Sequence, residues 1–306
     1  MLQAIQYYLS AIFRLNFFYL HFLNMKFKGS NMNYLIYVSR LLFIVLFISF
    51  SLLSSSCKKD PKRTAGAVIP TIDTPKTYKL VWSDEFDSTG ISVANWNFET
   101  GGSGWGNNEK EYYQSDNASV AGGNLVITAK KETVGSNNYT SARMTTLAKK
   151  EFTYGKIEAR IKIPVGQGLW PAFWLLGANI NNVSWPECGE TDIMEHINTD
   201  SLLYGTMHWN NNGHASYGNK VAVDSISNFH IYSIEWTASA IRWLVDGVEF
   251  NYGTISNGTN NTWAFQKPFF IILNLAVGGD WPGQTVDESK LPASMYVDYV
   301  RVYQKL

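Results

Sequence analysis

Apolar and polar residues alternate along many short segments from residue 78 onward. In residues 157–163 every second side chain is apolar and the residues between them are charged. Because successive side chains of a β-strand point to opposite faces, this period predicts a strand with one buried face. By the same reasoning, Val297 and Tyr299 are expected to share one face of another strand near the end of the chain.

The turns between these segments are marked by glycine and asparagine. Asp246-Gly247 separates the apolar-rich segments 241–245 and 248–252, and this dipeptide is a strong signal for a tight β-hairpin turn. We find no amphipathic helical repeat. Many short strands without helices predict an all-β fold, and we expect residues 78–306 to form one two-sheet antiparallel sandwich.

One predicted strand carries an unusual density of acids. Residues 190–195 read Glu-Thr-Asp-Ile-Met-Glu within an apolar, aromatic-rich stretch. Glu190 and Asp192 share a face, whereas Glu195 would point the opposite way in a regular strand. One extra residue at Ile193-Met194, a β-bulge, would return Glu195 to their face. The apolar neighbours favour a strand that lines a cleft over a solvated edge strand with three exposed acids.

Two carboxyl groups facing one cleft suit the hydrolysis of glycosidic bonds. One must be ionised to act as nucleophile or base, and the other must hold a proton for the leaving oxygen. We expect Glu190 to be the nucleophile, Glu195 the general acid/base, and Asp192 the residue that orients Glu190. The spacing leaves the stereochemical outcome open. A metal site is the alternative for clustered acids, but hard cations favour loops that wrap them, so we expect no catalytic cofactor.

Several further segments accompany the acidic one in a consistent order. They are 82–86 (WSDEF), 104–109 (GWGNNE), 154–160 (YGKIEAR), 169–174 (LWPAFW), 207–209 (MHW), 274–279 (NLAVGG), 281–283 (WPG) and 297–303 (VDYVRVY). With these segments the chain resembles glycoside hydrolase family 16 from Tyr78 to Gln304. Met194 in the expected bulge is similar to the laminarinase branch of the family, whereas the lichenase branch has the shorter E-x-D-x-E.

The resemblance implies a β-jelly roll of the concanavalin or lectin-like type, with a concave sheet that carries the substrate cleft. It also implies a retaining mechanism through a covalent glycosyl-enzyme intermediate, and endo-acting hydrolysis of laminarin-like β-1,3-glucan. Mixed-linkage β-glucan and the galactans agar and carrageenan stay open as substrates. Transglycosylation and a non-catalytic glucan-binding role stay open as alternatives to hydrolysis.

Aromatic and polar residues near the motifs are candidates for sugar contacts. Trp185, just before the acidic segment, is expected to stack on a glucosyl unit. The resemblance places His208 on the concave face near the acid/base, to contact sugar or tune Glu195; a buried structural histidine is the alternative. Trp170 and Trp174 stay open between cleft and core. Expected walls or hydrogen-bond donors of neighbouring subsites are Trp105, Asn108, Arg143 and Trp281.

An acid in the hydrophobic terminal strand suggests a second site. Asp298 lies among apolar and aromatic residues. The resemblance implies a structural calcium ion on the convex face, bound by Asp298 and by backbone carbonyls around Glu85 and Gly123. A surface salt bridge of Asp298 is the alternative.

The amino-terminal part reads as an export signal. The apolar run 41–53 is short for a bilayer span of about 20 residues but suits a signal-peptide core. Small residues directly before Cys57 resemble a bacterial lipoprotein signal. We therefore expect a signal at residues 32–56, lipidated Cys57 and a tether over residues 57–77, and an over-extended start at residues 1–31. This predicts a lipid-anchored protein of the bacterial cell envelope, with the anchor as its sole contact with the membrane.

Composition adds a few constraints. The 25 basic and 25 acidic residues leave no net charge, which argues against nucleic acid as a partner. Eleven Trp suit a β-glucan partner, because flat rings stack on the apolar faces of sugars. With Cys57 lipidated, Cys188 has no disulfide partner and is expected to be a small packed residue. We expect a monomer.

Overall fold

The computed structural model describes residues 78–256 and 260–306. The predictions for residues 1–31, 32–56 and 57–77, including lipidation of Cys57, lie outside the described residues. Within the described ranges, no helix is both long enough and apolar enough to span a membrane.

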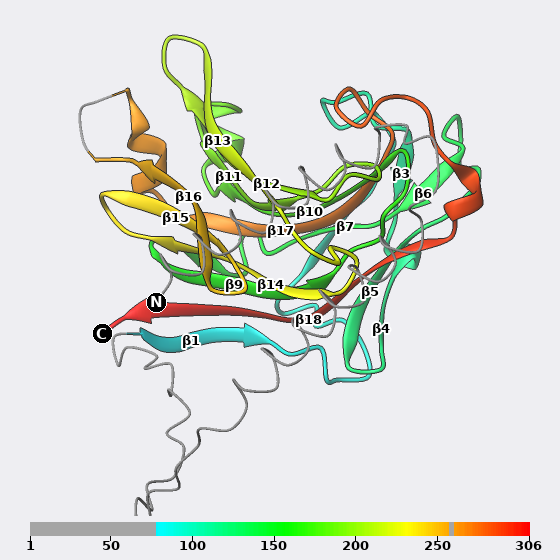
Figure 1. The fold of residues 1–306 in the computed structure, drawn as a ribbon, viewed down its shortest axis with the longest axis horizontal. Helices are drawn as coiled ribbons and strands as arrows, with labels where there is room; N and C mark the ends of the chain where they lie inside the picture. The colour runs from blue at the N-terminus through cyan, green and yellow to red at the C-terminus, as the bar shows by residue number, and fades with distance from the viewer. Residues whose placement is uncertain (1–77, 257–259) are drawn as a thin grey trace, which may run out of the picture. The chain divides into compact units, whose positions relative to one another are not determined.

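Two large antiparallel sheets dominate the fold (Figure 1). One, called the β9 sheet, has the strand order β16 (Val248–Thr254), β15 (Ala240–Val245), β14 (Phe229–Trp236), β9 (Gly155–Lys162), β18 (Ala293–Lys305), β5 (Asn124–Ala129) and β4 (Ala118–Ala121), and β1 (Tyr78–Asp84) pairs with β18. The other, called the β11 sheet, has the order β13 (His214–Ala222), β12 (Leu202–Asn210), β11 (Glu190–Glu195), β10 (Leu169–Gly177), β17 (Phe269–Val277), β7 (Arg143–Thr145) and β2 (Asn97–Glu99), and β8 (Glu151–Phe152) pairs with β17. The predicted all-β, two-sheet antiparallel sandwich is confirmed.

The remaining elements of the described residues are short. Strands β3 (Glu111–Tyr113) and β6 (Tyr139–Ser141) form a small parallel pair. The helical turns are η1 (Ser115–Asn117), α3 (Ile180–Val183), η2 (Thr262–Gln266) and η3 (Glu288–Lys290). Figure 1 shows the β11 sheet curving away from the β9 sheet, with β13 at one side of the curve and the β3–β6 pair at the other.

The core lies between the two sheets and follows the predicted alternation. The apolar residues of 157–163 are all buried in it. Strands β15 and β16 pair on either side of Asp246-Gly247 and form the expected hairpin. The β11 sheet contributes Phe173, Leu175 and Leu273 to this core. Residues at the alternate positions of β10 and β17, such as Trp174 and Asn274, therefore face the opposite side, away from the β9 sheet.

One predicted face is wrong. Val297 lies in the core, but the register of β18 against β9 shifts between Val297 and Tyr299, and Val300 takes the next core position. Tyr299 therefore faces outward, where the guanidinium carbon of Arg301 lies 3.8 Å from the centre of its ring. An irregularity in the strand reverses the alternation, and the sequence pattern contains no sign of it.

Candidate active site

The bulge predicted in the acidic strand is present. Against β12, Asp192 pairs with Thr206 and Glu195 pairs with Tyr204, so three steps along β11 match two along its neighbour. The extra residue leaves Ile193 and Met194 both buried in the core. Glu195 consequently lies on the same face of β11 as Glu190 and Asp192, away from the core.

A glycine sets the start of this strand. Gly189 has a φ of +79°, a conformation that side chains disfavour. A Cβ atom there would lie 2.7 Å from the Cβ of Ala264 and 3.0 Å from the ring of Phe269. The chain can therefore pass this close to η2 and β17 before Glu190 only with glycine at position 189.

Glu195 is held by a tryptophan of the neighbouring strand. The indole Nε1 of Trp170 donates a hydrogen bond to Glu195 Oε1 at 2.9 Å. Trp170 comes from β10, whose Ala172 pairs directly with Glu195. The ring of Trp281 meets Trp170 and Tyr204 edge-on, with centroids 5.4 and 4.9 Å away. Trp170 is thus a cleft residue that fixes one carboxyl group.

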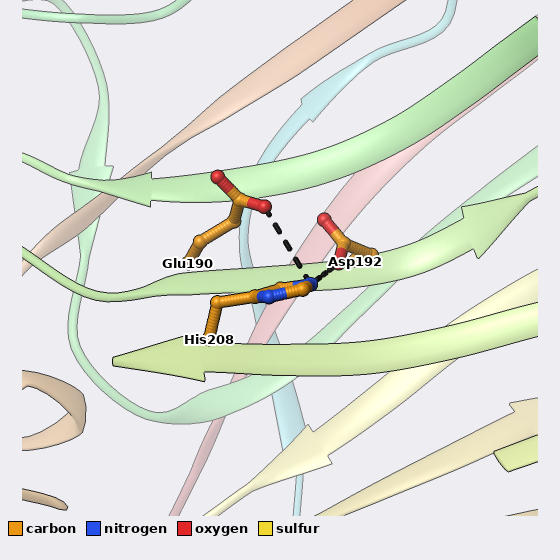
Figure 2. A group of neighbouring side chains, drawn as sticks. All are labelled: Glu190, Asp192 and His208. Carbon is orange, nitrogen blue, oxygen red and sulfur yellow. Dashed lines mark ion pairs between the residues drawn. The ribbon is translucent and has the colours of Figure 1, made fainter. Parts of the chain in front are cut away.

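At the other end of the strand, an imidazole faces two carboxylates. His208 pairs with Glu190 across the β11–β12 ladder. Figure 2 shows its ring beside both acids: Nε2 lies 3.1 Å from Asp192 Oδ2 and 3.8 Å from Glu190 Oε1. Tyr204 is the strand partner of Glu195, yet His208 is still close enough to lower the pKa of Glu195, as the expected tuning role requires.

Two further groups fix this end of the site. His208 Nδ1 and His214 Nε2 are hydrogen-bonded at 2.9 Å, and their rings are stacked. From the opposite sheet, Trp243 Nε1 donates a buried hydrogen bond of 2.8 Å to the backbone carbonyl of Asp192. The acidic strand is therefore tied both to its neighbour and to the core beneath it.

Burial raises the pKa values of the three acids, and the charge of Asp192 adds to the shifts of the two glutamates. Burial, with the charge of Asp192 as a second cause, raises the pKa of Glu190 to about 8. Burial also raises the pKa of Asp192 to about 8. The pKa of Glu195 lies well above its usual range, through burial first and then the charge of Asp192. The site therefore retains protons that isolated carboxyl groups would have lost at neutral pH.

A cavity of about 330 Å³ opens beside these acids. Arg143 lies within it, with its guanidinium 5.0 Å from the ring centre of Trp105 and 4.8 Å from that of Trp174. Its Nε is paired with Glu99. The other lining residues are Gly106, Asn107, Glu109, Trp170, Ala172, Leu176, Trp185, Glu190 and Asn274. Flat rings beside fixed polar groups suit a sugar, which has apolar faces and a rim of hydroxyl groups.

The other predicted contact residues flank this cavity. Trp185 is 44% exposed and its ring lies 4.6 Å from that of His214. Trp281 is 40% exposed beside Trp170. Asn108 is exposed and donates to both carboxylate oxygens of Asp280, so its side-chain amide is already engaged.

Two buried acids near the cavity were missed in the sequence. Glu109 accepts a hydrogen bond of 3.0 Å from the Tyr113 hydroxyl, and Glu111 Oε2 accepts one of 2.6 Å from the Val277 amide. Tyr113 accepts in turn from Asn274, at 3.1 Å. Burial, and then the charge of Glu109, hold the pKa of Glu111 well above its usual range. The signal available was Glu-Lys-Glu directly before an aromatic pair.

At the predicted calcium position the side chains form ion pairs. Asp298 Oδ2 accepts a hydrogen bond of 2.8 Å from Arg160, and Glu85 accepts two from Arg301. The register of β18 with β1 and β5 brings Glu85 and Gly123 to the neighbourhood of Asp298. The carboxylate of Asp298 thus has a cationic partner, as the salt-bridge alternative predicts.

Cys188 is fully buried in a small cluster with Leu176, Phe270 and Ile272. Burial raises the pKa of its thiol to about 11, and the nearby Glu190 adds to the shift. A thiol with this pKa stays protonated at neutral pH and is a poor nucleophile. Its predicted role as a small packed residue is confirmed.

Comparison with known proteins identifies the family. The model of the family described as "Glycosyl hydrolases family 16" matches residues 105–301. The chain belongs to this family. It is therefore a glycoside hydrolase, and the jelly-roll sandwich expected from the resemblance is confirmed.

Relatives within family 16 are similar over most of the described chain. The clotting factor G alpha subunit of Tachypleus tridentatus is 47% identical over 232 residues, which cover 74% of this chain and 34% of that protein. A beta-glucanase of Rhodothermus marinus is 41% identical over 244 residues, covering 74% of this chain and 85% of that protein. The solved catalytic domain of an endo-1,3-beta-glucanase (laminarinase) from Thermotoga petrophila RKU-1 is 45% identical with a TM-score of 0.70, covering 74% of this chain and 98% of that one.

Proposed function

We propose that this chain hydrolyses internal bonds of β-1,3-glucan with retention of anomeric configuration. The observation that carries the proposal is the bulge of β11, which puts Glu190, Asp192 and Glu195 on one face beside an aromatic cavity. The names of the relatives, a beta-glucanase and a laminarinase, support β-1,3-glucan as the substrate.

Glu195 is the general acid and then the general base. A carboxyl group with a strongly raised pKa keeps the proton that the leaving oxygen needs. The hydrogen bond from Trp170 occupies Oε1 and leaves the second oxygen free to face the glycosidic bond. After the first step the ionised group accepts a proton from the incoming water.

Glu190 is the nucleophile, and a protonated Asp192 together with His208 favours its ionisation. Burial opposes the ionisation of Glu190 most, and a negative charge on Asp192 is the next largest effect. A proton held on Asp192 removes that charge. Both His208 and Arg143 lower the pKa of Glu190 in opposition to these effects. The ionised carboxylate attacks the anomeric carbon as the leaving oxygen takes the proton of Glu195.

The aromatic residues around the acids supply the subsites. Trp185 is exposed at one side of the acidic strand and presents a ring for stacking. Trp105 and Trp174 hold the guanidinium of Arg143, which donates to sugar hydroxyls. Trp281 lies beside the general acid, and Asn108 supports the rim through its bonds to Asp280.

The test is reducing-end release by the purified protein on laminarin, mixed-linkage glucan, agarose and carrageenan in parallel. Release mainly from laminarin, with the β-anomer appearing first in the proton NMR spectrum, is the expected result. First appearance of the α-anomer would contradict retention and the nucleophilic role of Glu190. Release from a galactan alone would overturn the substrate and keep the chemistry.

Two other results would change the function itself. Folded protein that binds laminarin without cleaving it would favour a glucan-binding role. Products longer than the starting oligosaccharide would mean that a sugar, rather than water, resolves the intermediate.

A structural calcium ion near Asp298 stays a prediction. Arg160 supplies the cation for this carboxylate, and a calcium ion would have to share it. A melting temperature that does not change on addition of EDTA is the result that would favour the ion pairs alone.

We also propose that the chain is a lipoprotein of the cell envelope, anchored through Cys57. The support is the apolar segment 41–53 followed by small residues and this cysteine. The full chain should partition into the detergent phase of Triton X-114, and Cys57→Ser should move it to the aqueous phase. A variant that still partitions into detergent would contradict lipidation at Cys57.

A further inference from the structure

The trio in Figure 2 has the composition of a transition-metal site. One ligand atom each from Glu190, Asp192 and His208 lies within 4.8 Å of the others. His208 Nε2 is 3.1 and 3.8 Å from the two carboxylate oxygens. Ligands at the usual distance from a tetrahedral Zn²⁺ are about 3.3 Å apart. Small side-chain adjustments would therefore bring the three atoms onto one ion.

One carboxylate oxygen of the trio, Asp192 Oδ2, is buried without a hydrogen-bond donor from the described residues. The side chain of Asp192 is 4% exposed, and no hydrogen bond from the described residues reaches its Oδ2. His208 Nε2 is close to this oxygen but not aligned for a hydrogen bond. A buried, unsatisfied carboxylate oxygen facing an imidazole nitrogen is costly, and a shared cation would satisfy both.

The second nitrogen of the imidazole already has a suitable partner. Metal-binding histidines usually donate the other ring N–H to a neighbouring acceptor, which fixes the tautomer. His208 Nδ1 lies 2.9 Å from His214 Nε2. When Nδ1 donates to His214, the lone pair of His208 Nε2 faces Asp192 and Glu190.

The site is accessible from the cleft. The side chains of Glu190 and His208 are 18% and 22% exposed, so an ion can enter from solvent. Two carboxylates balance the charge of a divalent ion. Three protein ligands leave the fourth tetrahedral position to water.

We propose that, without bound glycan, Glu190, Asp192 and His208 bind one divalent transition-metal ion of the Zn²⁺ type, and that glycan and metal exclude each other. Exclusion rests on the proposed function, because the ion would occupy the carboxylate that attacks the sugar. Binding of the ion does not depend on it. Clustered acids on β11 alone would make a poor site for a hard cation, but the imidazole of β12 makes the trio suitable for a softer one.

Isothermal titration calorimetry of the full chain with ZnCl₂ at neutral pH tests the binding. We expect one ion per chain in the wild type and at least about tenfold weaker binding in His208→Gln. His230→Gln is the matched control, because His230 also contacts a carboxylate, Asp246 at 2.7 Å, but on the β9 sheet. Absence of binding in the wild type, or equal affinity in His208→Gln, would overturn the site.

A second titration separates this proposal from the catalytic one. A β-1,3-gluco-oligosaccharide at saturation should weaken Zn²⁺ binding to Glu195→Gln, a variant chosen to prevent turnover. Unchanged Zn²⁺ affinity there would overturn mutual exclusion. Loss of Zn²⁺ affinity in His208→Gln, in a protein that cleaves none of the four glycans, would support the metal site while the proposed function failed.

Discussion

The carboxylates of β11 lie close to one another, whereas those on the outer face of the β9 sheet, Glu85 and Asp298, are paired with arginines. On the outer face, Glu85 accepts hydrogen bonds of 2.9 and 2.8 Å from one guanidinium, that of Arg301. In β11, the Glu190 side chain is mostly buried, and Asp192 is the charged group that shifts its pKa most. The hydrogen bonds of Arg301 lower the pKa of Glu85, whereas burial raises that of Glu190.

The direction of the pKa shift distinguishes carboxyl groups that stabilise the folded state from carboxyl groups that act in catalysis. A carboxyl group whose pKa falls on folding stabilises the folded state above its unfolded pKa. A carboxyl group whose pKa rises on folding stabilises the folded state at low pH. This stabilisation is lost as the pH rises through the folded pKa, which for Glu190 is about 8. Perturbed carboxyl groups of the second kind cluster at functional sites.

Glu190→Gln should show the largest effect on activity. Loss of the nucleophile should lower kcat on laminarin by about 10⁴-fold or more. The melting temperature at pH 7 should not fall, because glutamine replaces a carboxyl group whose ionisation burial opposes. Kinetics and thermal melts of the same preparation test both statements. Near-normal turnover would mean that Glu190 is not the nucleophile.

Asp192→Asn should have a smaller effect on rate and a distinct effect on pH dependence. The charge of Asp192 raises the pKa of both Glu190 and Glu195. Because the pKa of Asp192 is about 8, this charge is present mainly at alkaline pH, so its removal should lower the pKa of Glu195 there and move the alkaline limb of the pH–rate profile to lower pH. We expect kcat to fall roughly tenfold to a hundredfold, the equivalent of about 1.4–2.7 kcal/mol. An unshifted profile would indicate a purely structural role.

Trp170→Phe should change the pKa of the general acid while Glu195 itself is kept. The variant keeps the ring beside Trp281 but loses the hydrogen bond to Glu195. This hydrogen bond lowers the pKa of Glu195, so its loss should move the alkaline limb to higher pH. We expect kcat to fall about tenfold. Trp263→Phe, at an exposed ring in η2, is the matched control and should leave the profile unchanged.

Glu85→Gln should give the smallest effect, and on stability alone. The ion pair with Arg301 is partly exposed, and such pairs contribute at most about 1 kcal/mol. The melting temperature should fall by about 2–4 °C at neutral pH. Because the pKa of Glu85 is lowered in the folded state, this difference should shrink as the pH falls through that value.

Turnover by Glu85→Gln should match the wild type. The contrast between the two regions would be broken by a stability loss in Glu190→Gln equal to that of Glu85→Gln. It would also be broken by a loss of turnover in the outer-face variant.

Much of the acidic strand could be predicted from the sequence. Three carboxylates in residues 190–195 at this spacing cannot share a face in a regular strand, so the bulge followed from the need to bring Glu195 around. The alternation in residues 157–163 and the Asp246-Gly247 turn were equally local signals. Each depends on the geometry of one strand or one turn.

The partners of these residues were decided by tertiary structure. Trp170 reaches Glu195, and His208 reaches Asp192, because β10 and β12 flank β11 in a particular register. The outward face of Tyr299 depends on an irregularity in β18 that only its pairing with β9 reveals. The strand that carries the acids can be identified from its residues alone, because side-chain alternation is local. Only the packed sheets decided which of the protein's acids meet a cation and which meet one another, because register and burial depend on residues distant in the chain.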